Sequence, residues 1–169
     1  VEDAVYLHPS VEECIVAGNP DVRLQVRSSA TVGHVSVKLC DVAPDGTSVL
    51  ITRGFLDLTH RGVWPGDPWG QVGAAPQPLQ PDTWIDVHIE LEATTWTLLP
   101  GHTLRLAIAG TDWPNCWPPA QPFTLSVPRG SVRMTVPPAT SLPALTDDLV
   151  PVPGKEAVSH EGVEWRYEH

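Results

Sequence analysis

Apolar and polar residues alternate in the stretch His34-Val35-Ser36-Val37-Lys38-Leu39-Cys40-Asp41. Successive side chains of a β-strand point to opposite faces, so the two valines and the leucine are expected on one face and Ser36, Lys38 and Cys40 on the other. Pro44-Asp45-Gly46 follows. This combination is typical of a hairpin turn, because Pro fixes φ and Gly accepts a positive φ. The stretch therefore predicts a strand and a turn, with the return strand at residues 48–52.

The same alternation recurs along the chain, whereas a sustained helical stripe of apolar residues does not. A short helical turn is predicted only near residues 10–13. Gly54 is expected to interrupt the strand or to allow a bulge or a close backbone approach. Further strands are predicted at residues 22–27, 55–58, 85–92, 103–108, 123–127 and 131–136. Eight or so short strands without crossover helices predict an all-β fold, an antiparallel sandwich.

The chain is expected to form one domain and a tail. Residues 1–136 carry the predicted strands, and residues 137–169 read as an extended, Pro-rich tail with a possible final strand at 162–168. The opening Val1-Glu2-Asp3-Ala4 resembles neither an initiator region nor a signal peptide, so we expect it to be a boundary inside a longer protein. No apolar run approaches the roughly 18 residues of a membrane span.

The formal charge of −10, from 20 acidic and 10 basic residues, counts against binding to phosphate-rich partners. A nucleic-acid binder needs a basic face, and no cluster of Lys and Arg is present to build one. The same deficit counts against anionic membrane surfaces. Neither nucleic acid nor membrane is therefore expected as a partner.

The cysteines and histidines show no metal-like spacing. Cys14, Cys40 and Cys116 are an odd number without a CxxC pair, so we expect buried, reduced thiols and favour a reducing compartment, the cytoplasm. The seven histidines are scattered, without HxH, HxxxH or HExxH. No metal and no cofactor are expected.

No catalytic centre is evident either. The strained elbow of an α/β-type serine hydrolase, G-x-S-x-G, is absent. A glycosidase needs two carboxylates a few ångströms apart, but among 20 acidic residues some pair meets this spacing by chance, so such a pair does not indicate an active site. We expect no catalytic residue in this chain. An enzyme whose active site is not recognisable from sequence motifs stays open as an alternative.

Four tryptophans fall on expected loops, at residues 60–81 and 112–119. Trp64 and Trp69 lie in the first loop and Trp113 and Trp117 in the second. An indole on a loop can cap the core, pack against a neighbouring domain or stack on a sugar, and exposed clusters of aromatic residues need a partner.

An ordered set of motifs resembles the C-terminal domain of X-Pro dipeptidyl-peptidases and cocaine-esterase-like (CocE/NonD) serine hydrolases, and the resemblance covers roughly residues 22–136. The motifs are Lys38-Leu39-Cys40-Asp41-Val42-Ala43-Pro44-Asp45-Gly46, Leu50-Ile51-Thr52-Arg53-Gly54, His60-Arg61, Leu79-Gln80-Pro81, Pro100-Gly101-His102-Thr103-Leu104-Arg105-Leu106 and Asp112-Trp113-Pro114.

The resemblance implies a jelly-roll β-sandwich of the galactose-binding-like type, attached to an α/β-hydrolase domain that carries the Ser-Asp-His triad. This chain would then be a non-catalytic accessory domain that packs on the catalytic domain, shapes substrate access and supports a possible homo-oligomer. Asp112-Trp113-Pro114 departs from the family's usual Asp-Phe-Pro, and the loop at residues 63–78 is longer than the family norm. The choice between an ester and a peptide substrate therefore stays open. The candidate contact residues are His60, Arg61, Trp64, Trp69, Asp112, Trp113 and Trp117.

Two further expectations follow from the residues. A free-standing carbohydrate-binding module that uses the loop tryptophans is the alternative function. Gly101 is expected to allow a sharp turn before the strand at 103–108. Arg105, on the non-core face of that strand, is expected to pair with a carboxylate of an adjacent strand such as Glu90.

Overall fold

A computed structural model describes residues 4–9, 12–62, 75–128 and 130–135. All of them belong to the first of two units, Val1–Ala139. The second unit, Thr140–His169, lies outside the described residues, as do the expected tail and its final strand. The predicted boundary at residue 136 stays a prediction.

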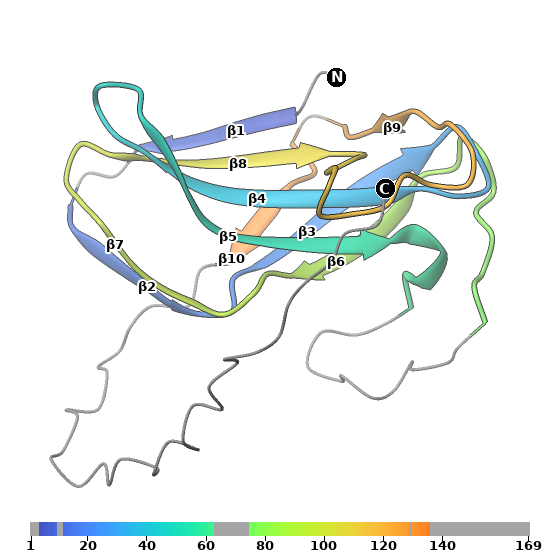
Figure 1. Cartoon of the computed structure of the whole chain (residues 1–169), viewed down its shortest axis with the longest axis horizontal. Coiled ribbons are helices and arrows are strands. Elements are labelled where there is room, and N and C mark those ends of the chain that lie inside the picture. Colours follow the sequence, from blue (N-terminus) through green and yellow to red (C-terminus); the bar gives the residue numbers. More distant parts are fainter. Residues whose placement is uncertain (1–3, 10–11, 63–74, 129, 136–169) are drawn as a thin grey trace, which may run out of the picture. The chain divides into compact units, whose positions relative to one another are not determined.

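Within the described residues the chain forms ten strands and one turn of 3-10 helix (Figure 1). These are β1 (Ala4–Pro9), β2 (Cys14–Gly18), β3 (Asp21–Ser28), β4 (His34–Val42), β5 (Ser48–Asp57), η1 (Leu58–His60), β6 (Ile85–Glu90), β7 (Thr94–Leu98), β8 (Thr103–Ala109), β9 (Leu125–Ser126) and β10 (Arg133–Thr135).

The strands form two larger sheets and one two-stranded sheet, all antiparallel. One sheet has the order β1-β8-β4-β5, the second has the order β10-β3-β6 with β9 also pairing with β3, and β2 pairs with β7. A single apolar core draws side chains from both larger sheets, which is the arrangement of a β-sandwich. The all-β, antiparallel prediction is confirmed, while the jelly-roll connectivity stays a prediction.

The central strand β4 is buried on both of its faces. Val35, Val37 and Leu39 enter the core and are 0–1% exposed, as the alternation predicts. Ser36 and Cys40 point the other way, yet they too are buried. Ser36 pairs with Phe55 and Ala109 of the neighbouring strands and lines a pocket together with residues of a loop that lies far along the chain.

Three strands were not predicted, namely β1, β2 and β7. β1 is an edge strand, and β2 and β7 each bury a single residue, Val16 and Leu98, which is too few for a period-two pattern. The predicted helical turn near residues 10–13 is absent in its described part, at Glu12 and Glu13. The strands predicted at 123–127 and 131–136 are present as the shorter β9 and β10.

Gly54 does not interrupt β5, which runs from Ser48 to Asp57. The irregularity lies opposite Leu39 and Cys40, whose partners are Thr52 and Leu50. Gly54 instead marks a close approach, because a Cβ there would lie 2.9 Å from the backbone oxygen of Glu90 and 2.8 Å from Leu91 Cδ2. The missing side chain lets β5 approach the chain around the end of β6.

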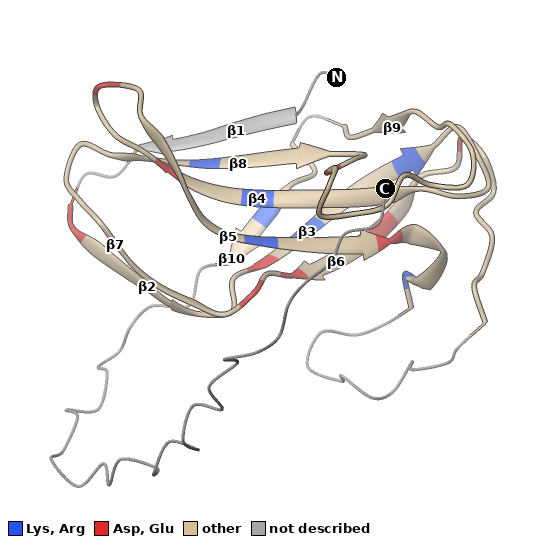
Figure 2. Ribbon diagram, in the orientation of Figure 1, with Lys and Arg blue, Asp and Glu red and all other residues tan. Residues whose placement is uncertain are grey.

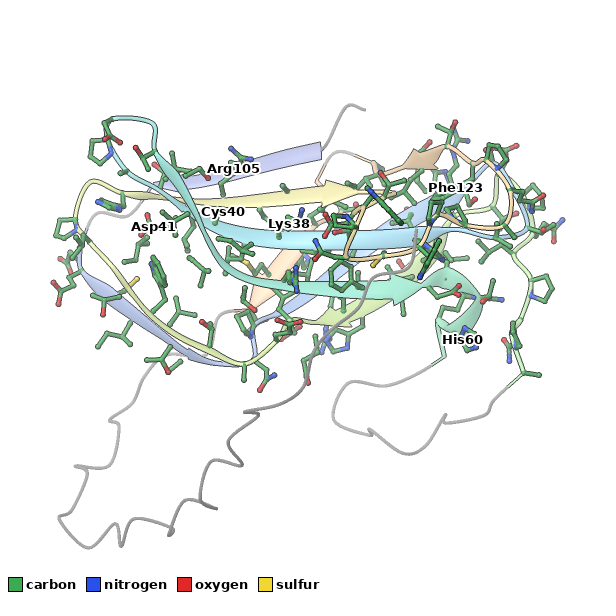
Figure 3. All side chains as sticks on the ribbon, in the orientation of Figure 1. Lys38, Cys40, Asp41, His60, Arg105 and Phe123 are labelled. Atoms are coloured by element: carbon green, nitrogen blue, oxygen red, sulfur yellow. The ribbon has the colours of Figure 1, made fainter. Side chains whose placement is uncertain are left out.

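A buried carboxylate links β4 to β7 and to the turn that follows β7. Asp41 accepts hydrogen bonds from Trp96 Nε1 at 2.9 Å and from the His102 ring at Nδ1, at 2.7 Å. Figure 3 labels Asp41 on β4. The turn itself depends on Gly101, whose φ is +80°, as expected for a sharp turn before β8.

The predicted pairing of Arg105 with Glu90 is wrong. Arg105 lies on β8, between Leu7 of β1 and Cys40 of β4, whereas Glu90 belongs to β6 in the other sheet. Its Nε is buried without a hydrogen-bond partner among the described residues. The alternation of β8 revealed the face of Arg105 but not its neighbouring strands.

We expect Gly54→Ala to lower the free energy of unfolding by about 1–3 kcal/mol, because the new methyl group overpacks the contact with Glu90 and Leu91. Urea denaturation followed by circular dichroism measures this. Gly62→Ala is the matched control, since a Cβ at Gly62 meets none of the described residues within 4 Å. Equal stability of the two variants would contradict the close approach at Gly54.

Candidate functional site

An ion pair between a half-exposed lysine and a buried carboxylate fixes the start of the loop between β8 and β9 on the outward face of β4. Lys38 Nζ donates to Asp112 Oδ1 at 2.5 Å, and the Asp112 side chain is only 7% exposed. Asn115 Nδ2 donates to the other carboxylate oxygen at 3.2 Å, and the backbone N–H of Cys116 donates to the Asp112 carbonyl at 2.9 Å. The carboxylate is thus satisfied on both oxygens, and the turn after it is closed.

The far end of this loop is fixed as well. The backbone N–H of Thr124 donates to Ser29 Oγ at 2.8 Å, and Gln121 donates to Thr31 Oγ1 at 2.8 Å. Phe123, labelled in Figure 3, packs on Gly110, where a Cβ would lie 3.2 Å from its ring. The loop is therefore held at both ends by contacts with the sandwich.

Two tryptophans project from the middle of the loop. Trp113 is 64% exposed and Trp117 is 80% exposed. Their rings meet edge to face, with centroids 5.6 Å apart and planes at 71°. Large apolar side chains this exposed are typical of a surface that binds a partner.

A second cation lies directly opposite Lys38 on the same outward face. Lys38 is in register with Arg53 of β5, and Figure 2 shows the basic segments of these strands beside each other. Like charges directly opposite one another are unfavourable, so each needs an acid. The Asp112 carboxylate pairs with Lys38, and Glu92 Oε1 lies 3.7 Å from Arg53 Nε. The Arg53 guanidinium also lies over the Phe55 ring, 5.6 Å from its centroid.

Two hollows flank the segment at residues 111–113, and each is bounded by β4. One of about 330 Å³ is lined by Ser36, Lys38, Ala107, Ala109, Thr111, Asp112 and Trp113. The other, of about 210 Å³ and mostly apolar, is lined by His34, Val35, Ser36, Phe55, Leu56, Asp57, Thr111, Asp112 and Cys116. We call the second hollow the Phe55 pocket.

His60 lies beside the Phe55 pocket through Asp57. Its Nδ1 is 3.6 Å from Asp57 Oδ2, and His34 Nε2 is 3.9 Å from the same oxygen. Burial alone would raise the pKa of Asp57, but hydrogen bonds from the hydroxyl and backbone of Thr59, with the two histidines, outweigh it and lower the pKa. The Asp57 carboxylate therefore stays charged to a lower pH than an ordinary aspartate.

Arg61 is turned toward the chain itself. Its guanidinium donates to the Leu58 carbonyl at 3.2 Å and to the Gln77 carbonyl at 2.8 Å. These bonds connect Leu58 with Gln77, which lie before and after residues 63–74 in the sequence. Trp64 and Trp69 lie outside the described residues, so their predicted role stays a prediction.

The structure thus brings Asp112, Trp113 and Trp117 together in one loop. His60 does not line the Phe55 pocket, but it contacts Asp57, which does. Lys38, Phe55 and Cys116 belong to the same surface and were not among the predicted site residues. The alternation of β4 did place Lys38 outward. The missing information was the register with Arg53, which puts two cations side by side and calls for a carboxylate.

All three cysteines are free thiols, but only Cys40 is buried. The expectation that all are buried is wrong for Cys14, which is exposed, and for Cys116, which is half-buried. Burial, with the nearby Asp112 carboxylate, raises the pKa of Cys116. Among the residues that the structure describes, no three His, Cys, Asp or Glu side chains are grouped to hold a metal ion.

None of the helices in the described part of the chain has the length and apolar character to cross a membrane.

We expect Lys38→Met to destabilise the chain by about 1–3 kcal/mol, because Asp112 is left as a buried, unpaired charge. The usual cost of breaking a buried pair is reduced here, since Lys38 is 37% exposed. Urea midpoints measure the change. The double variant Lys38→Met/Asp112→Asn should recover part of the loss, and no recovery would contradict a charge-based anchor.

Asp57→Asn should lower stability at pH 7 and pH 5, and this effect should shrink only once the pH falls below about 4, the ordinary pKa of an aspartate. A carboxylate whose pKa is lowered in the folded state stabilises the fold above its unfolded pKa, and this contribution is lost as the pH falls through the folded value. Urea titrations at pH 7, 5 and 3 measure the difference. Glu13→Gln, at an exposed position, is the control. A difference that is constant with pH would contradict the assignment.

Comparison with known proteins gives the family. The model of the X-Pro dipeptidyl-peptidase C-terminal non-catalytic domain matches residues 8–162. A candidate serine esterase of Mycobacterium bovis is 36% identical over 105 residues, covering 57% of this chain and 17% of the relative. The cocaine esterase of a Rhodococcus strain is 27% identical over 100 residues, covering 59% of this chain and 16% of the relative.

A solved α-amino acid ester hydrolase has a similar fold. Its TM-score is 0.66 at 20% sequence identity, over 80% of this chain and 25% of that one. The chain spans only about a sixth of the length of the two curated relatives. The family model covers far more than half of the chain, and the resemblance found in the motifs is confirmed. The chain belongs to the family of X-Pro dipeptidyl-peptidase C-terminal non-catalytic domains.

Proposed function

We propose that this chain is the accessory domain of a larger α/β-hydrolase-type serine hydrolase, on whose catalytic domain it packs. The family is non-catalytic, and two relatives are named as a candidate serine esterase and a cocaine esterase. The matched segment is about a sixth of each relative, so most of each relative lies outside it. The chemistry belongs to that larger part.

The exposed indoles of Trp113 and Trp117 carry the proposal. A surface that shows two tryptophans to solvent gains free energy when another surface covers them, and aromatic residues are enriched where domains and proteins meet. The loop that holds them is fixed at both ends, by Asp112 to Lys38 and by Thr124 to Ser29. Little conformational entropy is therefore lost when this loop docks.

The same surface can shape substrate access. Asp112 and Asp57 both line the Phe55 pocket, and His60 contacts Asp57. A catalytic domain docked here would have the loop between β8 and β9, which we call the tryptophan loop, and the end of β5 as one wall of its active-site entrance. The substrate would be an ester or an amide of a chemistry that this wall alone does not specify.

The carbohydrate-binding alternative is less favoured by the geometry. A sugar ring stacks on a flat aromatic face, whereas the planes of Trp113 and Trp117 are inclined at 71° and form no common platform. An edge-to-face pair presents a ridge, which suits a complementary protein surface better.

Binding of this chain to the separately produced catalytic domain of its parent hydrolase tests the proposal. We expect micromolar or tighter binding by calorimetry. The variant Trp113→Ala/Trp117→Ala should bind at least tenfold more weakly, because truncating a central interface tryptophan costs about 2 kcal/mol or more. Trp84→Ala is the matched control, since Trp84 is also exposed but stacks under Arg27.

A fluorophosphonate probe completes this experiment. It should label the catalytic domain, which shows that this domain is folded, and leave the 169-residue chain unlabelled. Stoichiometric labelling of the chain, or equal binding by the double tryptophan variant and wild type, would overturn the proposal. Fluorescence quenching across a glycan panel would favour the carbohydrate alternative. Sedimentation of the chain alone tests whether it forms a homo-oligomer.

A further inference from the structure

The Phe55 pocket offers a specific anchor point on the proposed docking surface. Its volume is about 210 Å³, and its lining is mostly apolar, with Val35, Phe55, Leu56 and Cys116 among the wall residues. Engineered cavities of about 150 Å³ with apolar walls hold a benzene ring. The pocket is therefore large enough for one leucine-sized or ring-sized side chain.

The two carboxylates of the pocket already have partners. Asp112 accepts from Lys38 and Asn115, and Asp57 accepts from Thr59. Among the described residues, the buried side-chain atoms without a partner are His88 Nδ1 and Arg105 Nε, and neither residue lines the pocket. Neither carboxylate needs a further ligand and the lining is mostly apolar, so burial of apolar area is what an occupant gains.

The pocket and the tryptophans are parts of one turn. The N–H of Cys116, in the pocket wall, donates to the carbonyl of Asp112, and Trp113 and Trp117 are the neighbours of these two residues in sequence. Asp112 lines both the Phe55 pocket and the other hollow, which Trp113 also lines, so a partner that covers the indoles comes close to the pocket. Protein interfaces commonly place one apolar or aromatic side chain in such a pocket, surrounded by contacts that exclude water.

We propose that the Phe55 pocket receives one apolar side chain, of leucine to phenylalanine size, from the catalytic domain that covers Trp113 and Trp117. This inference rests on the proposed function and adds the chemistry of the contact.

Disulfide exchange at Cys116 tests the pocket within the intact 169-residue chain. The chain is equilibrated with phenethyl or hydroxyethyl disulfides at graded reductant, and the adducts are mapped by mass spectrometry. Cys14 is the internal control, because it is exposed and does not line the pocket. The phenethyl adduct should survive about tenfold more reductant on Cys116 than on Cys14, whereas the hydroxyethyl adduct should show no such preference. Equal survival of the phenethyl adduct on both thiols, or no adduct on Cys116, would overturn the proposal.

Binding to the catalytic domain then identifies the occupant. Cys116→Phe fills the pocket with a ring of its own and should weaken binding at least tenfold, while Cys14→Phe should leave it unchanged. Thermal unfolding checks that both variants are folded. If Cys116→Phe binds like wild type while Trp113→Ala/Trp117→Ala does not, the pocket inference is wrong and the docking function stands. If the wild-type chain does not bind at all, the proposed docking function is wrong, and the catalytic domain is then not the source of the side chain in the pocket.

Discussion

The ion pair between Lys38 and Asp112 determines how the outward face of the β1-β8-β4-β5 sheet is arranged. The core fixes the position of Lys38, because its neighbour Val37 is fully buried and β4 is hydrogen-bonded on both sides. Lys38 in turn neutralises the buried Asp112 carboxylate. Asp112 closes the turn that presents Trp113 and Trp117. A contact inside the fold thus sets the position of side chains that are largely exposed.

Much of the fold could be predicted from local pattern. Alternation located β3, β4, β6 and β8, because each buries one face in a shared core and this leaves a period of two in the sequence. It missed β2 and β7, which pair only with each other. It also could not reveal that Ser36 is buried beside a pocket, since Thr111 and Asp112 of that pocket lie more than seventy positions away. Tertiary cover of a polar face leaves no local periodicity.

The parts of the site that unusual composition marks could be predicted from the sequence. The parts that depend on strand register and on the order of strands could not. Trp113 and Trp117 stood out because a turn-rich segment with two indoles has no place for them in a strand. The Phe55 pocket did not stand out, because its walls come from β4, β5 and the loop, which only the folded topology brings together. The error at Arg105 has the same origin, since the strand order that separates β8 from β6 is not written in either strand.

The two-ended attachment of the tryptophan loop separates recognition from folding. Asp112 anchors one end on β4, and Thr124 anchors the other beside Ser29, so the residues between them have no part in the core of the sandwich. Apart from Asn115, Gln121 and Phe123, which help to hold the loop, these residues can change without changing the framework, as the side chains on an antibody loop change on a constant scaffold. One sandwich could therefore be matched to differently shaped catalytic domains by exchanging about ten residues.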